Sequence, residues 1–373
     1  PQLQGVRIES VNGPYGLRRM VEKMLPEFYP LHSGLTTGTC ATAAAIAATL
    51  RLFRNETPCE VPVILPDGET IIVPVSYGDG FASVQKEAGD DPDVTNGLEI
   101  RAAVSEGEAD EPITILGGEG VGVFTLPGFD FPPGCPAINK APREMIRKNL
   151  AAILSPSTSL TVTISVPQGA DIAHRTFNPR LGIEGGISII GVSGIVKPFS
   201  EEAFIDSIRK CMTVAKAFGA ERVVINSGGK SERYVKALYP DLPQQAFVEY
   251  GNYIGETLKI ASELNIERIT LGVMLGKAVK LAAGHLDTHS RKATMDKTFI
   301  QQMLEEAGIR LDLTDVTLAR ELWNMIPSEK LQAFSDVIIG HCAEHCRPLL
   351  PHGQLVVLLI DDLGEVRGAS GDR

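Results

Sequence analysis

The pattern of apolar residues changes near residue 200, and this change limits the possible folds more than any other feature of the sequence. In the preceding part, short apolar runs flank Asp-Gly or Gly-rich turns, which predicts strands joined in antiparallel hairpins. The runs are residues 61–75, 112–128 and 159–169. Two helices are expected in the same part, at residues 39–53 and 142–154.

Beyond residue 200, expected strands and helices alternate. The expected helices are residues 200–219, 251–265, 294–308 and 328–346. The expected strands are residues 221–229, 267–275 and 354–368, the last with a closing hairpin. Strands that alternate with helices of this length predict a parallel sheet covered on both faces. The boundary between the two parts is expected between residues 190 and 202.

The balance of charges excludes some classes of partner. The 373 residues include 35 Lys and Arg against 46 Asp and Glu, so the net charge is −11, and an acidic protein repels polyanions. One Trp and 6% aromatic residues also argue against a surface that stacks nucleobases. We therefore expect no nucleic-acid partner. No apolar run approaches the roughly 18 residues of a membrane-spanning helix, so no membrane partner is expected either.

The six cysteines are scattered along the chain, apart from Cys342 and Cys346. Scattered thiols in a chain of this size are typical of the reduced state, and the first ten residues lack the apolar core of a signal peptide. Both observations predict a cytoplasmic protein. The segment HCAEHC (341–346) has the composition of a zinc site. On a helix, however, its His pair and its Cys pair point about 100° apart, so no protein-bound metal is expected there.

The segment SGLTTGTCATAAA (33–45) places hydroxyl residues and glycines directly before an Ala-rich helix. The first turn of a helix has unpaired N–H groups and the positive end of the helix dipole. Gly38 allows close approach, and Thr36, Thr37 and Thr39 add hydroxyl donors, so the turn is a candidate site for a carboxylate or phosphate. The alternative is a buried helix for which Thr37 or Thr39 is the cap.

A second polar segment, KEAGDDPDVTNG (86–97), gathers Asp90, Asp91, Asp93 and Asn96. Their oxygen atoms suit a hard cation, but the spacing is not that of an EF-hand, and a solvated loop is the alternative. The segment GGEGVG (117–122) does not lie between a parallel strand and a helix, so it predicts a glycine-rich hairpin rather than a dinucleotide-binding turn.

In the second part, VVINSGGKSE (223–232) takes a predicted strand into Ser227, Gly228, Gly229 and Lys230. Ligands bind beyond the carboxyl ends of parallel strands, so this turn is a candidate binding loop, with a plain strand-to-loop turn as the alternative. In the first part, Asn178 and Arg180 precede another glycine-rich turn, and an arginine there can pair bidentately with a carboxylate. His285 and His289 share a face on a helix but not on a loop, and two histidines are weak evidence for a metal.

Taken together, these segments resemble one family. They are SGLTTGTCATAAA, KEAGDDPDVTNG, GGEGVGVFTLPG, PAINKAPREMI (136–146), TFNPRLGIEGGISIIGVSGIVKP (176–198), INSGGKSE and AAGHLDTHS. The resemblance is to the CbiD family, whose members are the cobalt-precorrin-5B C(1)-methyltransferases of the anaerobic cobalamin pathway. It extends from about residue 33 to about residue 290, and several long motifs stand in the same order. The HCAEHC segment belongs to no pattern of the family.

The resemblance implies an α+β N-terminal domain, residues 1–198, followed by an α/β Rossmann-like C-terminal domain, residues 199–373. This division agrees with the change of pattern near residue 200. It also implies transfer of a methyl group from S-adenosylmethionine to C-1 of cobalt-precorrin-5B, a tetrapyrrole, to give cobalt-precorrin-6A. The cobalt comes with the substrate. The resemblance does not assign the methyl donor and the macrocycle to particular domains. Whether the protein forms a homo-oligomer also stays open.

The chemistry of these ligands indicates which residues bind them. The tetrapyrrole carries acetate and propionate arms that need local donors, and the positive charge of the methyl donor suits a carboxylate. The residues expected to bind substrate or cofactor are Thr36, Thr37, Gly38, Thr39, Asp90, Asp91, Asp93, Asn96, Asn178, Arg180, Ser227, Gly228, Gly229 and Lys230. His289 is expected to be catalytic, as the base that takes the released proton or as an axial ligand of the cobalt. A structural histidine is the alternative.

Two other functions compete with this interpretation. One is a nucleotide-binding phosphotransferase. The Thr/Gly helix start and the SGGK turn favour it, although no P-loop pattern is present. The other is a non-catalytic tetrapyrrole-binding protein. It would bind the macrocycle without affinity for S-adenosylmethionine.

Overall fold

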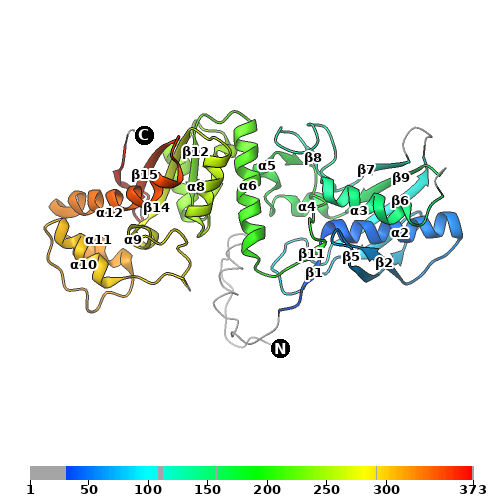
Figure 1. The fold of residues 1–373 in the computed structure, drawn as a ribbon, viewed down its shortest axis with the longest axis horizontal. Helices are drawn as coiled ribbons and strands as arrows, with labels where there is room; N and C mark the ends of the chain where they lie inside the picture. Colours follow the sequence, from blue (N-terminus) through cyan, green and yellow to red (C-terminus); the bar gives the residue numbers. More distant parts are fainter. Residues whose placement is uncertain (1–30, 108–111, 156–157, 291, 372–373) are drawn as a thin grey trace. The chain divides into compact units, whose positions relative to one another are not determined.

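The computed structural model describes residues 31–107, 112–155, 158–290 and 292–371 (Figure 1). The chain divides into two compact units, residues 1–200 and residues 201–373. Each unit combines helices with sheets of its own, so the fold is mixed α/β with several sheets. Within the described ranges, no helix is long and apolar enough to cross a membrane.

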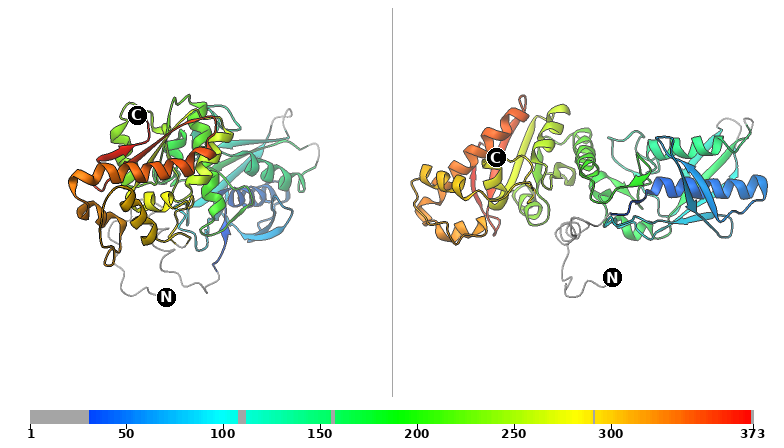
Figure 2. Two further views of the ribbon diagram at one scale, coloured as in Figure 1. Left: turned by 60° about the vertical axis from the view of Figure 1, so that its left-hand side comes forward. Right: turned by 60° about the horizontal axis from the view of Figure 1, so that its bottom comes forward.

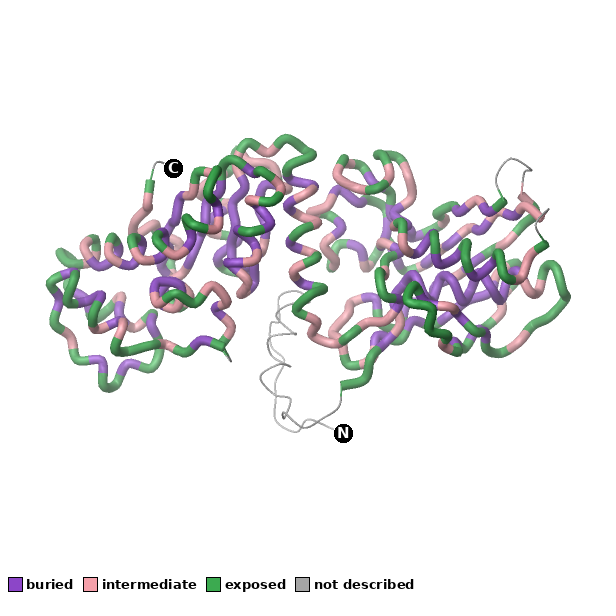
Figure 3. Tube along the Cα trace, in the orientation of Figure 1, coloured by how far each residue is buried: buried purple, intermediate pink, exposed green. Residues whose placement is uncertain are grey.

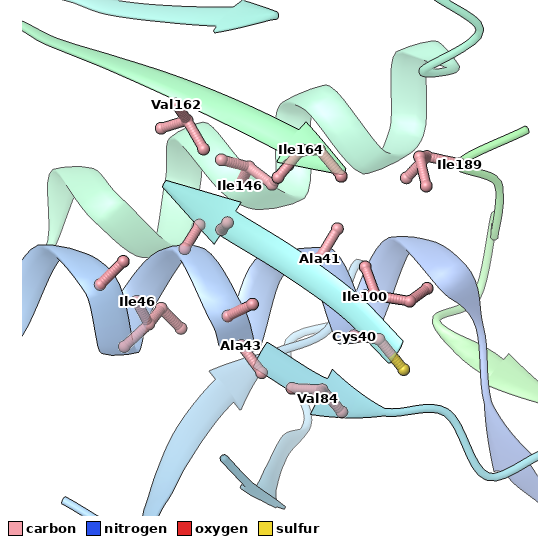
Figure 4. Close-up of a cluster of buried hydrophobic side chains, with 14 of the residues drawn as sticks. Cys40, Ala41, Ala43, Ile46, Val84, Ile100, Ile146, Val162, Ile164 and Ile189 are labelled. Carbon is pink, nitrogen blue, oxygen red and sulfur yellow. The ribbon is translucent and has the colours of Figure 1, made fainter. Parts of the chain in front are cut away.

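Helix α2 (Thr37–Arg54) forms the centre of the first unit and confirms the helix predicted there. It is rich in alanine, which loses no side-chain freedom on entering a helix and allows neighbouring elements to approach closely. Residues 37–49 are buried without interruption. Figure 4 shows Ala43 beside Val84 and Ala41 beside Ile100, both from strands of the adjoining sheet. A helix enclosed in this way fixes the position of every segment bonded to its first turn.

The sheet that adjoins α2 has the strand order β4-β5-β6-β9-β7. Its strands are β4 (Ser76–Tyr77), β5 (Ala82–Gln85), β6 (Glu99–Glu106), β9 (Leu160–Ser165) and β7 (Ile113–Gly117). All neighbours are antiparallel except β7 and β9, which are parallel. Burial alternates along β9, so one face of the sheet packs on the core. Helix α3 (Lys140–Ala151) contacts α2 and corresponds to the second predicted helix.

The hairpin predicted for residues 61–75 is confirmed as β2 (Glu60–Ile64) and β3 (Thr70–Pro74). The hairpin predicted for residues 112–128, with its glycine-rich turn 117–122, is wrong. Its first strand pairs in parallel with β9, and its second, β8 (Val123–Phe124), pairs with β10 (Ile183–Glu184).

The physical reason for this error lies in the glycine-rich segment. The carbonyl oxygen of Gly120 lies 2.1 Å from where a Cβ of Gly169 would stand and 2.2 Å from where a Cβ of Gly186 would stand. These glycines therefore bring three distant backbone segments together instead of closing a local turn. The remaining short elements of this unit are β1 (Gly34–Leu35), β11 (Ile195–Val196), α4 (Gly169–Ala173) and α5 (Asn178–Leu181).

The second unit contains a five-stranded sheet in the order β13-β12-β14-β15-β16. The strands are β12 (Val223–Asn226), β13 (Phe247–Glu249), β14 (Arg268–Met274), β15 (Gln354–Ile360) and β16 (Val366–Ala369). The first four are parallel, and β16 is antiparallel to β15. The predicted parallel sheet and its closing hairpin are thus confirmed. Figure 3 shows the central strands of this sheet as continuous buried segments.

Helices surround this sheet, and several of them contact its strands directly. They are α6 (Glu201–Ala217), α7 (Lys230–Leu238), α8 (Ile254–Glu263), α9 (Leu275–Ala282), α10 (Lys297–Glu306), α11 (Leu322–Met325) and α12 (Leu331–Cys346). Short 3₁₀ turns are Gln244–Ala246, Ala319–Glu321, Ser328–Lys330 and Arg347–Leu349. Val235 of α7 packs in a cluster with Val224, Leu358 and Ile360, while α12 lies along β15 (Figure 2). The four helices predicted in this part are confirmed as α6, α8, α10 and α12, whereas β13, α7 and α9 were not predicted.

Candidate functional site

Four candidate residues of the first unit meet at the first turn of α2. Thr36 precedes the helix as its N-cap, and its side-chain oxygen accepts a hydrogen bond from the backbone N–H of Thr39 at 3.2 Å. The hydroxyl of Thr39 donates to the carbonyl oxygen of Gly194 at 2.6 Å. The N–H of Gly38 donates to the carbonyl oxygen of Ile190 at 2.9 Å. The first turn is therefore capped by the protein itself.

Thr37 and Asn178 hold the same loop from two sides. The Thr37 hydroxyl accepts from the N–H of Ile190 at 2.8 Å and lies 3.2 Å from the carbonyl oxygens of Ser188 and Ile190. The Asn178 amide donates to the carbonyl oxygen of Gly186 at 2.9 Å, and its oxygen accepts from the Ser188 hydroxyl at 3.0 Å. We call residues 186–194 the capping loop. These bonds agree with the capped-helix alternative for the Thr-rich turn, but the cap is Thr36 and not Thr37 or Thr39 as predicted. They give Thr37, Thr39 and Asn178 protein partners.

The acidic segment 86–97 is built on a buried ion pair. The ammonium of Lys86 lies 2.7 Å from a carboxylate oxygen of Asp93, and the Lys86 side chain is 1% exposed. The other Asp93 oxygen accepts from the N–H and the hydroxyl of Thr95 at 2.8 and 2.6 Å. Burial acts to raise the pKa of Asp93, but the Lys86 charge and these hydrogen bonds outweigh it, so the pKa lies below its usual value.

The other polar residues of this segment have different partners. Asp90 accepts from the backbone N–H of His32 at 2.6 Å, a bond that lowers the pKa of Asp90. Asp91 accepts from the N–H of Phe199 at 3.0 Å, and the Asn96 side-chain oxygen accepts from the N–H of Ala88 at 2.8 Å. Across the described ranges, no group of three or more His, Cys, Asp and Glu side chains is arranged to hold a metal ion. The side chains of Asp90, Asp91 and Asn96 accept hydrogen bonds from neighbouring backbone N–H groups.

Arg180 is half-buried in α5, and its guanidinium carbon lies 5.7 Å from the centre of the Phe177 ring. The same α5 begins with Asn178, so Arg180 is carried close to the residue that holds the capping loop. Lys197, beyond the capping loop, is exposed. The first unit therefore brings together Thr36, Thr37, Gly38, Thr39 and Asn178 directly, with Arg180 on the adjoining turn.

In the second unit, the SGGK turn lies at the carboxyl end of β12, between two parallel neighbours. Asn226, fully buried, accepts from the N–H of Gly228 at 2.8 Å through its side-chain oxygen. Gly228 and Gly229 have φ of +80° and +57°, a region that favours glycine. Gly229 is the N-cap of α7, and within the part of the chain that the structure describes, only its chain neighbours have atoms within 4 Å of where its Cβ would stand. Ser227 is buried, whereas Lys230 is exposed.

A lysine joins the turn after β13 to the segment that contains His289. The Lys277 ammonium, in the first turn of α9, donates to the carbonyl oxygen of Gly251 at 2.7 Å, to the side-chain oxygen of Asn252 and to the Thr288 hydroxyl at 3.1 Å. The N–H of Thr288 in turn donates to the carbonyl oxygen of Asn252 at 3.0 Å. We call residues 226–230, 249–252, Lys277 and Thr288 the strand-end cluster.

His289 directly follows Thr288 and is half-buried. Its backbone N–H donates to Asp287 at 3.0 Å, and its carbonyl oxygen accepts from the N–H of Ala293 at 2.8 Å. Residues 285–290 are not helical, so His285 and His289 do not share a helix face. His285 is exposed.

Cys40, Cys342 and Cys346 are buried thiols. Burial raises the pKa of Cys40, in the first turn of α2, to about 12, and it raises the pKa of Cys346 to about 12. Cys342 donates to the carbonyl oxygen of Ala278 at 3.3 Å, and burial raises its pKa as well. His341 lies 2.8 Å from a carboxylate oxygen of Glu306. Burial therefore favours the neutral thiol at these positions over the thiolate, which is the form that binds metals and attacks carbon.

Sequence reasoning missed Lys86, Glu249 and Lys277. Lys86 stands in a polar segment, where a lysine is usually exposed, so no local signal marks its burial. Glu249 ends a strand of three residues that the pattern did not predict. Lys277 lies in the unpredicted helix α9. A strand detected at residues 247–249 would have pointed to Glu249, because polar residues at strand ends gather at one edge of a parallel sheet.

Comparison with known proteins adds a second kind of evidence. Two family models match the chain, one described as CbiD over residues 26–198 and one described as the CbiD C-terminal domain over residues 287–371. A curated relative from Prosthecochloris aestuarii, named cobalt-precorrin-5B C(1)-methyltransferase, is 40% identical over 88% of this chain and 94% of its own length. A relative of the same name from Moorella thermoacetica is 39% identical over 91% of this chain and 94% of its own length.

A solved structure is also similar to the chain. It is described as the cobalamin biosynthesis protein cbiD from Archaeoglobus fulgidus and is 30% identical, with coverage of 77% of this chain and 88% of that chain and a TM-score of 0.41.

The hydrogen bonds of Thr37 generate a prediction about the capping loop. Thr37→Val removes the hydroxyl that accepts from the N–H of Ile190, and the unpaired N–H should lower the free energy of unfolding by about 1–3 kcal/mol. Thr37→Ser keeps the hydroxyl and should stay close to the unaltered protein. Urea denaturation measures both variants. Unchanged stability of Thr37→Val together with weaker ligand binding would instead show that the hydroxyl serves a ligand.

The Lys86–Asp93 pair generates a pH-dependent prediction. Asp93→Asn leaves a buried ammonium without its counter-charge, which should cost about 3–5 kcal/mol of unfolding free energy at neutral pH. The pKa of folded Asp93 is lowered from 3.8, so its contribution is present above that value and is lost as the pH falls through the lower folded-state pKa. The difference between variant and unaltered protein should therefore shrink in acid.

A double variant controls for this interpretation. Lys86→Met combined with Asp93→Asn removes both charges and keeps the amide oxygen that can accept from Thr95. It should recover much of the stability lost in Asp93→Asn, because the uncompensated charge is gone. A double variant as unstable as the single one would show that packing, and not the ion pair, holds this segment.

Proposed function

The chain belongs to the CbiD family, and from that membership we propose that it methylates C-1 of cobalt-precorrin-5B to give cobalt-precorrin-6A in cobalamin biosynthesis. The observation that carries this proposal is the extent of the match, 40% identity over 88% of the chain and 94% of a relative that bears this enzyme's name. A match of that length includes both units. The protein is a methyltransferase, and the phosphotransferase and carrier functions are not favoured.

We propose S-adenosylmethionine as the methyl donor. When bound, this molecule supplies an electrophilic methyl group, and the electron-rich ring carbon of the substrate is the nucleophile. The protein then needs no activated serine or cysteine, in agreement with the neutral thiol of Cys40. Its residues have to hold the two ligands in line at about 3–3.5 Å, which can lower the barrier by several kcal/mol.

We further propose that residues 199–373 form a Rossmann-like domain and residues 1–198 an α+β domain. Two observations support this division: the compact units meet at residue 200, and the first family model ends at residue 198. In the sheet order β13-β12-β14-β15, β13 lies on one side of β12 and the later strands β14 and β15 lie on the other side. The order of connection therefore reverses between β12 and β14, and ligands of such sheets bind at that point. The turn Ser227–Lys230 follows β12 there, which supports the strand-end cluster as the donor site.

The glycines of this turn fit a nucleoside ligand. Among the described residues, no atom other than those of its chain neighbours lies within 4 Å of where a Cβ of Gly229 would stand. In this proposal Gly229 admits the ligand close to the backbone, and Gly228 leaves room for the side chain of Glu249 beside the turn. Ser227 and the first N–H groups of α7 orient the ligand, and Lys230 at the exposed edge attracts anionic groups.

The first unit is the proposed partner for the anionic arms of the tetrapyrrole. Because Thr36, Thr37, Thr39 and Asn178 are bonded to the capping loop, their proposed contribution is to fix that loop and the first turn of α2. Arg180 is the proposed carboxylate-binding cation on the adjoining turn. Gly38 is buried, and a Cβ there would stand 3.0 Å from the carbonyl oxygen of Ile190, so its proposed contribution is to let the capping loop approach the helix start. Asp90, Asp91, Asp93 and Asn96 are proposed to hold the segment against which the turn is built.

His289 is the proposed catalytic base. The imidazole can accept the proton released from the macrocycle after methylation. It follows Thr288, a member of the strand-end cluster that is bonded to Lys277 and Asn252. The backbone bond from His289 to Asp287 supports a defined position for the residue.

The reaction itself is the first test. The purified protein, given S-adenosylmethionine with a labelled methyl group and cobalt-precorrin-5B under anaerobic conditions, should yield a tetrapyrrole heavier by one methyl group. Mass spectrometry of the product and the label in it provide the measurement. Calorimetry should show binding of S-adenosylhomocysteine and none of ATP. Label that never reaches the tetrapyrrole would refute the methyl transfer.

The role of His289 is tested by His289→Gln, which keeps a hydrogen-bonding group but removes the base. Turnover should fall by about 100-fold or more, while the affinity for the tetrapyrrole stays the same. His285→Gln, on the exposed part of the same loop, is the matched control and should keep full turnover. A changed visible spectrum of the bound tetrapyrrole would identify His289 as a cobalt ligand, and lost stability with normal turnover would leave it a structural residue.

A further inference from the structure

The end of β13 brings a carboxylate against the glycine turn. Glu249 is the last residue of β13 and lies in register with Asn226, the last residue of the neighbouring β12. The backbone N–H of Tyr250 donates to the carbonyl oxygen of Asn226 at 2.7 Å. The side chain of Asn226 donates to the carbonyl oxygen of Val248 at 3.3 Å. The two strand ends are thus bonded to each other.

The missing side chain of Gly228 makes room for this carboxylate. A Cβ at Gly228 would lie 2.1 Å from one carboxylate oxygen of Glu249, 2.4 Å from its carboxyl carbon and 3.0 Å from the other oxygen. Any larger residue at position 228 would displace Glu249. The side-chain oxygen of Asn226 fixes Gly228 by accepting from its N–H at 2.8 Å. The carboxylate therefore lies directly against the turn.

Gly229, next in the chain, is exposed at the start of α7. Among the residues that the structure describes, no atom other than those of its chain neighbours lies within 4 Å of where a Cβ of Gly229 would stand. A ligand over the turn thus meets backbone at the start of α7 and the Glu249 carboxylate at the neighbouring strand end. An acidic residue in this relation to a glycine turn, about 20 residues after it, binds the hydroxyls of a ribose in dinucleotide-binding sheets. Two carboxylate oxygens match the two hydroxyls of a vicinal diol, since each hydroxyl can donate one hydrogen bond.

We propose that Glu249 binds the ribose diol of the methyl donor and so selects a ribonucleoside at the strand-end cluster. This assignment rests on the proposed use of S-adenosylmethionine. Charge-assisted bonds of this kind are the stronger class of hydrogen bond. Because they contact the ribose, they act on affinity for the donor and its product and leave the methyl-accepting carbon untouched.

Calorimetry on the full chain tests the assignment with S-adenosylhomocysteine and its 2′-deoxy analogue. Glu249→Gln should weaken binding of S-adenosylhomocysteine about tenfold or more. The unaltered protein should bind the 2′-deoxy analogue correspondingly more weakly, and Glu249→Gln should bind both compounds with nearly equal affinity. Glu267→Gln is the matched control, since Glu267 is exposed and directly precedes β14 at the opposite edge of the same sheet. This control should leave both affinities unchanged.

The outcomes separate this inference from the function on which it rests. If Glu249→Gln and the unaltered protein bind S-adenosylhomocysteine equally, or if the variant still distinguishes the two compounds as strongly as the unaltered protein, Glu249 is not the diol acceptor and the methyl transfer still stands. If the unaltered protein binds no S-adenosylhomocysteine, the proposed donor falls and the inference falls with it. The comparison on the unaltered protein needs no variant, so a folding defect of Glu249→Gln cannot mask the result.

Discussion

The parallel register of β12 with its two neighbours is the constraint on which the candidate donor site depends. Asn226 pairs with Glu249 on one side, while Ile225 pairs with Leu271 on the other. Because all these strands run in the same direction, their polar ends must meet at one edge of the sheet. A slip of one residue would turn Asn226 and Glu249 to the opposite face and separate the carboxylate from the glycine turn. The hydrogen bonds of the Asn226 side chain with Gly228 and with the carbonyl oxygen of Val248 oppose that slip.

The first unit uses its charged and hydroxyl groups differently. The hydroxyl of Thr39 bonds to the capping loop, and Lys86 and Asp93 neutralise each other inside the acidic segment. A buried polar group without a partner is costly, so these groups have to be satisfied within the protein once α2 is enclosed. The unusual composition of this region therefore follows from enclosing a helix start. In the proposed function, these groups act on binding through the shape of the loop that they hold.

Much of this architecture could be predicted from the sequence, and the exceptions share a physical cause. Long periodic segments such as α2 and α6 carry their own signal, and the Asp-Gly turn at residue 67 specifies the hairpin of β2 and β3. Strand β13 has three residues, too few for a period to show. The turn at residues 117–122 was misjudged because its glycines serve contacts with Gly169 and Gly186, and such distant contacts leave no local trace. The contact between Glu249 and Gly228 also leaves no local trace in the sequence, because it follows from the register of β12 with β13.

The two candidate regions thus differ in how much order is built in before a ligand binds. At the strand ends, Asn226 already holds Gly228, and Lys277 already joins Asn252 to Thr288. A ligand there meets fixed groups, and little further ordering opposes binding. A small, rigid nucleoside gains most from such a site. The flexible acid arms of a macrocycle match longer side chains such as Arg180, which can adjust to each arm while the capping loop keeps their base in place. In the proposed function, rigid recognition of the donor is combined with adaptable recognition of the acceptor, which suits a reaction in which alignment is the main requirement.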